Sequence, residues 1–238
     1  MEIKQRPSPN FNDTSYPLDA VVLHTTLGAY EGAVEWLRMS PEERLRKTGT
    51  KSWSSAHFVI SRIGEIAQLV QLNKAAWHAG VKFRMSKRAK AVIKKTLFVF
   101  VNPNSHTIGI EFASGYDIDR DGVLETWEKL YTPQQVKAAA WLILYCEKVL
   151  SIKIPNSRIL THKDIASYKP DLELQRIMTI VSINKLRTER EAAEVKPEPA
   201  PIKSVVVTEP VLVDKLTLKD GDTLKVKVIE GKVELYKV

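Results

Sequence analysis

The sequence predicts an α/β domain with a mixed central β-sheet flanked by helices, followed by a small all-β unit. Short apolar runs that suit buried strands alternate with helical patterns as far as residue 188. Residues 189–203 are first charged and then proline-spaced, which favours an extended linker. Residues 204–238 alternate valine and leucine with polar residues around two turn signals. We therefore expect a domain at 1–188, a linker at 189–203 and a β unit at 204–238.

Strands are expected in the short apolar runs of the first domain. Residues 20–24 form such a run, which ends in a histidine, His24. Residues 56–62 and 65–71 predict a hairpin that turns at Ile63-Gly64, and residues 107–112 predict a third strand region. The sheet should therefore be assembled from segments that lie far apart in the chain.

Helices are expected where the apolar residues recur with helical spacing. One follows residue 24 through Ala33, Trp36 and Leu37, and another begins at Ser40, with a proline in its first turn. The clearest covers 133–150, because Thr132 and Gln135 form a capping box around Pro133. A last helix is expected at 172–190.

The C-terminal β unit is too small for an ordinary core. It has fewer than about 40 residues, and such units rarely fold unaided without a metal, a disulfide or association. It contains no cysteine and no histidine. We expect it to dock on the main domain or to self-associate.

Composition excludes several classes of protein. The 238 residues are 44% hydrophobic and 27% charged, as in an ordinary globular protein. No apolar run approaches the roughly 18–20 residues of a membrane span, and the first twenty residues lack the centre of a secretory signal, so we expect synthesis in the cytoplasm. Cys146, the single cysteine, lies in an apolar stretch and is expected to be a packing residue. The net charge of +8 favours polyanionic partners, but no nucleic-acid motif accompanies it.

Two histidines suit a catalytic metal site. His24 ends a predicted strand, and His162 lies in a polar loop that also holds Asp164 and Asp171. A catalytic zinc takes three such ligands and leaves a fourth position for water, which it makes acidic. A lone histidine is more often a packing residue, and the 138 residues between these two make the spacing alone a weak signal. Hydrolysis is the natural chemistry of such a site.

A second metal motif lies at residues 117–128. It satisfies the pattern D-x-D-x-D-G-x5-E of a calcium loop, with candidate ligands Asp117, Asp119, Asp121, Val123, Glu125 and Glu128. The loop is single and follows a strand rather than a helix. We therefore weigh a structural Ca²⁺ site against an acidic surface turn.

Six sequence words occur in the order typical of a known family. VVLHTT, SSAHFVISRIGEIAQLV, AWHAG, NPNSHTIGIEF, YTPQQ and THKDIASYKPD together resemble the zinc-dependent N-acetylmuramoyl-L-alanine amidases, which include phage endolysins, a cytosolic muropeptide-recycling enzyme and peptidoglycan recognition proteins. The resemblance covers about residues 18–180. It implies a mixed sheet with helices and a Zn²⁺ in a groove on one side.

The resemblance also implies roles for individual residues. It makes His24, His162 and Asp171 the zinc ligands, with Asp164 as the competing carboxylate, because the family's acidic ligand follows two residues after a lysine. That lysine, Lys169, would stabilise the developing oxyanion.

Glu111 stands where the family's recycling enzymes have a general base. Ala56 replaces the tyrosine that some members have directly before His57, so base duty should rest on Glu111, and His57 should be a packing residue. Trp77 and His78 resemble groove residues that contact substrate.

The resemblance implies a peptidoglycan hydrolase that cuts the amide between N-acetylmuramic acid and L-alanine. A phage or prophage endolysin, which reaches the wall after membrane permeabilisation, suits the charge and the appended unit. The alternatives are a cytosolic recycling amidase and a non-catalytic peptidoglycan-binding module. The basic residues within 82–95 form either a solvated helix face or a cationic patch for anionic cell-envelope polymers.

Overall fold

The computed structural model describes residues 1–14, 16–26, 28–80, 102–114, 131–166, 172–194, 224–229 and 232–237. The chain divides into two compact units, Met1–Glu194 and Val195–Val238. Among the described helices, none is both long enough and apolar enough to cross a membrane.

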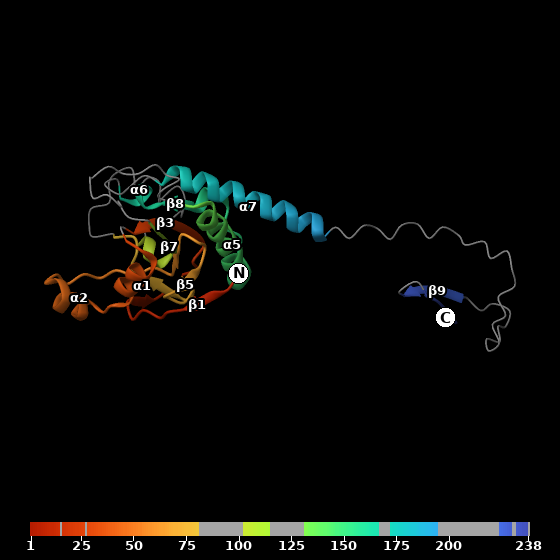
Figure 1. The fold of residues 1–238 in the computed structure, drawn as a ribbon, viewed down its shortest axis with the longest axis horizontal. Helices are drawn as coiled ribbons and strands as arrows, with labels where there is room; N and C mark the ends of the chain where they lie inside the picture. Colours follow the sequence, from red (N-terminus) through yellow and green to blue (C-terminus); the bar gives the residue numbers. More distant parts are fainter. Residues whose placement is uncertain are drawn as a thin grey trace. The chain divides into compact units, whose positions relative to one another are not determined.

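A six-stranded mixed sheet forms the centre of the first unit (Figure 1). In spatial order its strands are β1 (Ile3–Gln5), β5 (Ile66–Gln68), β4 (Phe58–Ile60), β7 (Thr107–Ala113), β3 (Ala20–Thr26) and β8 (Ile159–Thr161). β4 and β5 are antiparallel and joined by a turn at Gly64, whose φ is 85°. The other neighbouring strands of this sheet are parallel. The predicted mixed sheet and hairpin are thus confirmed.

A smaller antiparallel pair lies outside this sheet. It joins β2 (Phe11–Asp13) to β6 (Lys74–Ala76). β6 leads directly into Trp77 and His78, so this pair fixes the entry to the segment 77–80.

Two of the described helices begin where the sequence places a capping residue. α1 (Tyr30–Arg38) and α2 (Pro41–Thr48) follow β3, and α5 (Pro133–Leu150), α6 (His162–Ile165) and α7 (Glu173–Glu194) lie in the second half. The predicted capping box of Thr132 with Gln135 is present on α5, and Ser40 forms a second one with Glu43 on α2. Each satisfies backbone N–H groups that a helix start would otherwise leave without partners. Two short 3₁₀ turns, Pro103–Ser105 and Asn156–Arg158, complete the described elements of the first unit.

Helix α7 is longer than the sequence predicts. It continues to Glu194, four residues beyond the predicted end at residue 190, so residues 189–194, which we assigned to the start of the linker, are helical. This segment, Glu-Arg-Glu-Ala-Ala-Glu, consists of strong helix formers. Its charges indicated a linker, but glutamate, arginine and alanine extend an existing helix, and the first proline comes only at Pro197.

The two faces of the sheet bury different sets of residues. The larger core lies between the sheet and α5 with α7, and takes alternate strand residues, among them Leu23, Ile110 and Phe58. On the opposite face, Val59, Ala67 and Ala113 pack with α1. Because side chains alternate along a strand, the residues next to Leu23 and Ile110 face away from α5. These neighbours are His24 and Glu111.

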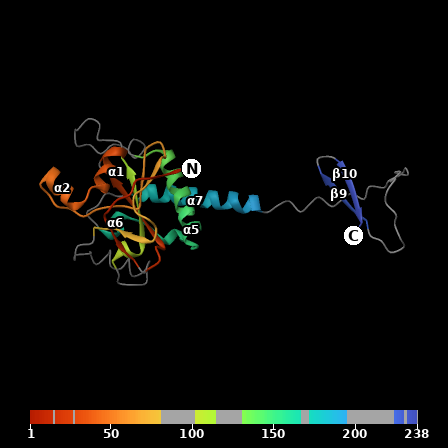
Figure 2. The ribbon, with the colours of Figure 1, turned by 90° about the horizontal axis from the view of Figure 1, so that it is seen from below.

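The second unit contains one described pair of strands. β9 (Leu224–Ile229) and β10 (Lys232–Lys237) are antiparallel, with Leu224 opposite Lys237, and lie side by side in Figure 2. The all-β character of the whole segment 204–238 stays a prediction.

Candidate active site

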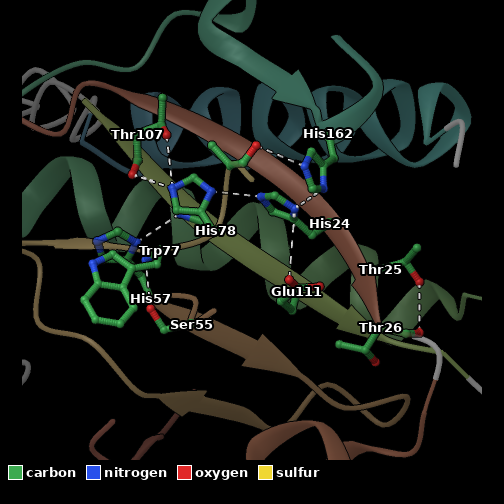
Figure 3. Close-up of polar contacts among 12 residues, drawn as sticks. His24, Thr25, Thr26, Ser55, His57, Trp77, His78, Thr107, Glu111 and His162 are labelled. Carbon is green, nitrogen blue, oxygen red and sulfur yellow. Dashed lines mark hydrogen bonds and ion pairs between the residues drawn. The ribbon is translucent and has the colours of Figure 1, made fainter. Parts of the chain in front are cut away.

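Two central strands place His24 and Glu111 side by side. β3 and β7 are parallel, and His24 is in register with Glu111. Both project from the face opposite α5, and His24 Nδ1 lies 4.0 Å from Glu111 Oε1 (Figure 3). The side chain of Glu111 is only 13% exposed, and that of His24 only 2%. A carboxylate is costly to bury without a partner, so its place beside the imidazole gives it a reason to be there.

A third strand brings His162 to the same point. β8 pairs with β3 on the side away from β7, and His162 is the first residue of α6, directly after β8 ends. Its Nδ1 lies 2.8 Å from His24 Nδ1. Residues 138 positions apart therefore converge because parallel strands end at the same edge of the sheet.

The Nε2 atoms of both imidazoles form hydrogen bonds, one to another histidine and one to a backbone carbonyl. His162 Nε2 lies 3.3 Å from the carbonyl oxygen of Ala79. His24 Nε2 lies 2.9 Å from His78 Nδ1, and His78 Nε2 lies 3.1 Å from the carbonyl oxygen of Thr107 (Figure 3). A carbonyl only accepts, so His78 Nε2 donates, His78 Nδ1 accepts, and His24 Nε2 donates in turn. Burial, above all, lowers the pKa of His78 well below 6.5, which keeps this ring neutral.

These hydrogen bonds assign lone pairs to the two facing nitrogens. With Nε2 as the donor, a neutral imidazole carries its lone pair on Nδ1, in His24 as in His162. Two acceptor atoms 2.8 Å apart repel each other unless they share a cation. Zinc binds imidazole nitrogens at about 2.0–2.1 Å, which places two of them about 3.3 Å apart in a tetrahedral site. The two imidazoles fit a metal centre if the distance between their Nδ1 atoms increases by about 0.5 Å.

The remaining predicted ligands divide between described and undescribed parts of the chain. Asp164 Oδ2 accepts hydrogen bonds from the Thr161 backbone (2.8 Å) and hydroxyl (3.0 Å), so this competing carboxylate caps α6. Asp171 and Lys169 lie outside the described residues, as do the calcium motif at 117–128 and the basic segment 82–95. Within the described ranges, no group of three histidine, cysteine or acidic residues suits a metal ion.

A cavity of about 540 Å³ opens onto the histidine pair. Its wall includes His24, Glu111 and His162 together with three tryptophans, Trp36, Trp53 and Trp77. Trp53 is 51% exposed and Trp36 36%. The sequence interpretation used Trp36 only as part of a helix pattern and did not consider Trp53. Their aromatic character was visible in the sequence, but their place on this wall was not.

Arg44 holds two parts of that wall together. Its buried guanidinium donates to the carbonyl oxygen of Trp36 and to Ser52 and Ser54, and its Cζ lies 4.9 Å from the centre of the Trp36 ring. Because these partners come from the end of α1 and from the segment before β4, Arg44 fixes both sides of the tryptophan wall.

His57 has the packing role expected of it. It is fully buried, its Nδ1 accepts from the Gly109 N–H at 3.0 Å, and its Nε2 lies 3.0 Å from the carbonyl oxygen of Lys74. Burial lowers its pKa to about 4. His57 is thus a neutral link between β6 and β7.

His78 lines the cavity, but its ring nitrogens bind His24 and Thr107. A direct contact between His78 and substrate stays a prediction. Trp77 also lines the cavity, and its contact with substrate likewise stays a prediction.

Comparisons with known proteins agree with this fold. The family model described as N-acetylmuramoyl-L-alanine amidase matches residues 14–173. A curated relative, N-acetylmuramoyl-L-alanine amidase A of Achromobacter lyticus, is 33% identical over 73 residues, which are 30% of this chain and 36% of that protein. The match thus spans about a third of the relative's length.

Among solved structures, the selenomethionine derivative of AmpD is similar, with a TM-score of 0.52 and 22% identity over 76% of this chain and 94% of that one. This likeness concerns the fold, and the family match covers most of the first unit. On that match, the chain belongs to the N-acetylmuramoyl-L-alanine amidase family.

Proposed function

We propose that this chain is a zinc-dependent peptidoglycan hydrolase that cuts the amide between the lactyl group of N-acetylmuramic acid and L-alanine. The observation that carries the proposal is the His24–His162 pair, whose Nδ1 atoms face each other at 2.8 Å beside Glu111 in a cavity of about 540 Å³. The family match and the name of the Achromobacter relative support the choice of bond.

The proposed zinc ligands are His24, His162 and Asp171. Zinc bound there would supply an electrophile that polarises the amide carbonyl and lowers the pKa of a water molecule. The orientation of both imidazoles is set in advance by the hydrogen bonds of their Nε2 atoms to His78 and Ala79.

Glu111 is the proposed general base. Its carboxylate shares the cavity with the two histidines and is largely shielded from solvent. It would take a proton from the attacking water and return it to the departing L-alanine nitrogen. Lys169 is proposed to stabilise the negative oxygen that forms on the carbonyl carbon.

The direct test identifies the bond that is broken. Purified sacculi are digested with the full-length protein, and mass spectrometry should find free lactyl carboxylates on muramic acid and new L-alanine amino ends. Removal of metal by a chelator and dialysis should abolish this release, and added Zn²⁺ should restore it. Release of the same ends by the metal-free protein would overturn the mechanism.

Glu111→Gln separates base chemistry from metal binding. Glutamine keeps the size of the side chain but cannot take the proton, so kcat should fall by a factor of about 10²–10⁴. Bound zinc, measured by atomic absorption, should stay at the native level. A variant with native kcat would exclude Glu111 as the base.

We propose an endolysin as the biological setting, made in the cytoplasm and active on the wall after membrane permeabilisation. The net charge of +8 and the second unit support it. In this setting the basic residues within 82–95 would attract anionic envelope polymers, and the second unit would associate with a second copy. An endolysin should cut intact sacculi faster than soluble anhydro-muropeptides, and a recycling enzyme should show the reverse preference.

A further inference from the structure

One short segment contacts both histidines of the pair. His78 accepts from His24 through its ring, and the next residue, Ala79, accepts from His162 through its carbonyl oxygen at 3.3 Å. The side chain of one residue and the backbone of its neighbour thus set which nitrogen of each imidazole carries the proton. A displacement of residues 78–79 would therefore reorient both imidazole rings.

Asn104 fixes this segment from a separate loop. Its Oδ1 accepts from the backbone N–H of His78 at 3.1 Å and from that of Ala79 at 2.8 Å. Asn104 lies in the 3₁₀ turn Pro103–Ser105, whose start is capped by the side chain of Asn102. One amide oxygen therefore holds the backbone of both residues that contact the imidazoles.

Strand β7 holds the His78 ring from below. The strand has no side chain at Gly109, and a Cβ placed there would lie 2.5 Å from His78 Cγ. Two residues earlier, the carbonyl oxygen of Thr107 accepts from His78 Nε2, so the ring can neither tilt nor reverse without losing this bond. His78 is only 5% exposed, so water cannot replace its partners at low cost.

We propose that Asn104 and His78 are positioning residues that orient both metal-binding imidazoles at once. The inference rests on the metal-binding part of the proposed function. It goes beyond the zinc ligands themselves, because it assigns the preorganisation of two ligands, 138 residues apart in the sequence, to one amide oxygen. Partners of this kind change metal affinity by about 10- to 100-fold when they are removed.

The test measures metal binding and needs no substrate. In the full-length protein, Asn104→Leu removes the acceptor for both N–H groups, and Asn104→Asp keeps an oxygen in its place. His78→Phe removes both ring nitrogens at similar volume. Zinc affinity is measured by competition with a chromophoric chelator, and the coordination of Co²⁺ by its visible absorption spectrum.

We expect Asn104→Leu and His78→Phe to weaken Zn²⁺ binding by about 10- to 100-fold and to change the Co²⁺ spectrum. Asn104→Asp should keep zinc affinity close to native. Gln135→Leu is the matched control, because Gln135 also donates to two backbone carbonyls, of Ile60 and Ala113, but on the α5 face of the sheet. It should lower thermal stability and leave zinc affinity and the Co²⁺ spectrum unchanged.

Native affinity and a native spectrum in Asn104→Leu would overturn the proposal, whatever His78→Phe does. An equal loss of affinity in Asn104→Leu, Asn104→Asp and Gln135→Leu would also overturn it, because the effect would then follow general destabilisation. The proposed reaction fails by a different result. If native protein shows the expected metal binding but leaves sacculi uncut, the hydrolase assignment falls and the positioning role stands.

Discussion

Gly109→Ala tests how tightly the His78 ring packs on strand β7. An added Cβ would lie 2.5 Å from His78 Cγ, 2.8 Å from Cδ2 and 2.9 Å from Cβ. Ordinary contact begins near 3.4 Å, so the two groups must move apart by about 0.9 Å. The nearest atoms belong to the root of the His78 side chain. A change of rotamer would therefore leave part of the clash in place.

The expected magnitude combines two opposing effects. Replacing glycine by alanine within a strand stabilises a protein by about 0.5–1 kcal/mol, because the unfolded chain loses freedom. Overpacking in a buried site costs about 1–3 kcal/mol. His78 is held at both ring nitrogens and at its backbone N–H, so relaxation is restricted. We expect a net loss of about 1–2 kcal/mol in the free energy of unfolding.

Urea denaturation of the native and variant proteins measures this loss, and chelator competition measures zinc affinity in the same samples. Gly32→Ala is the control, because Gly32 lies in α1 and a Cβ there meets nothing within 4 Å. It should stabilise the protein by up to about 1 kcal/mol. A Gly109→Ala protein that is as stable as native and binds zinc equally well would refute the packing argument.

Three further predictions concern pH, helix capping and the cavity wall. The pKa of His57 is about 4 in the folded protein and 6.5 for an ordinary histidine. As the pH falls from 6.5 to 4, the unfolded chain therefore takes up the proton first, and up to about 3 kcal/mol of the free energy of unfolding is lost. The melting temperature should fall less steeply over this pH range in His57→Gln than in the native protein. An equal dependence of the melting temperature on pH in the two proteins would contradict the neutral, buried state assigned to His57. Ser40→Ala should lower the free energy of unfolding by about 1 kcal/mol because it removes the α2 cap, whereas Ser40→Thr keeps the hydroxyl and should not. Denaturant midpoints measure both variants, and equal losses would mean that the cap contributes nothing to stability. Trp53→Ala should raise KM for peptidoglycan with little change in kcat or melting temperature, because Trp53 is half exposed on the cavity wall; an unchanged KM in steady-state assays would remove it from the binding surface.

Local signals carried the prediction of the helices and of the hairpin. The capping boxes at Ser40 and Thr132 act within four residues, so the sequence contains all that is needed to place those helix starts. The same holds for the turn at Gly64, where φ is 85°. The end of α7 was harder to predict, because the charged residues 189–194 suit both a linker and an exposed helix.

The candidate site was predictable only in part. His24, His162 and Glu111 could be named from the sequence, through the strand pattern and the family resemblance. The hydrogen bonds that orient the two imidazoles could not be predicted, because His78 was expected only to contact substrate, and Asn104 and the Ala79 carbonyl carry no chemical signal of their own. The capping role of Asp164 could not be predicted from the sequence either, because it depends on α6 starting directly after β8.

The sequence by itself determined which residues alternate along β3 and β7, because the spacing of apolar residues dictates which side chains share a face. It could not determine that these two strands pair in parallel with His24 opposite Glu111, nor that β8 brings His162 to within 2.8 Å. Pairing and register depend on burying both faces of the sheet against helices far along the chain, and only the tertiary structure decides them.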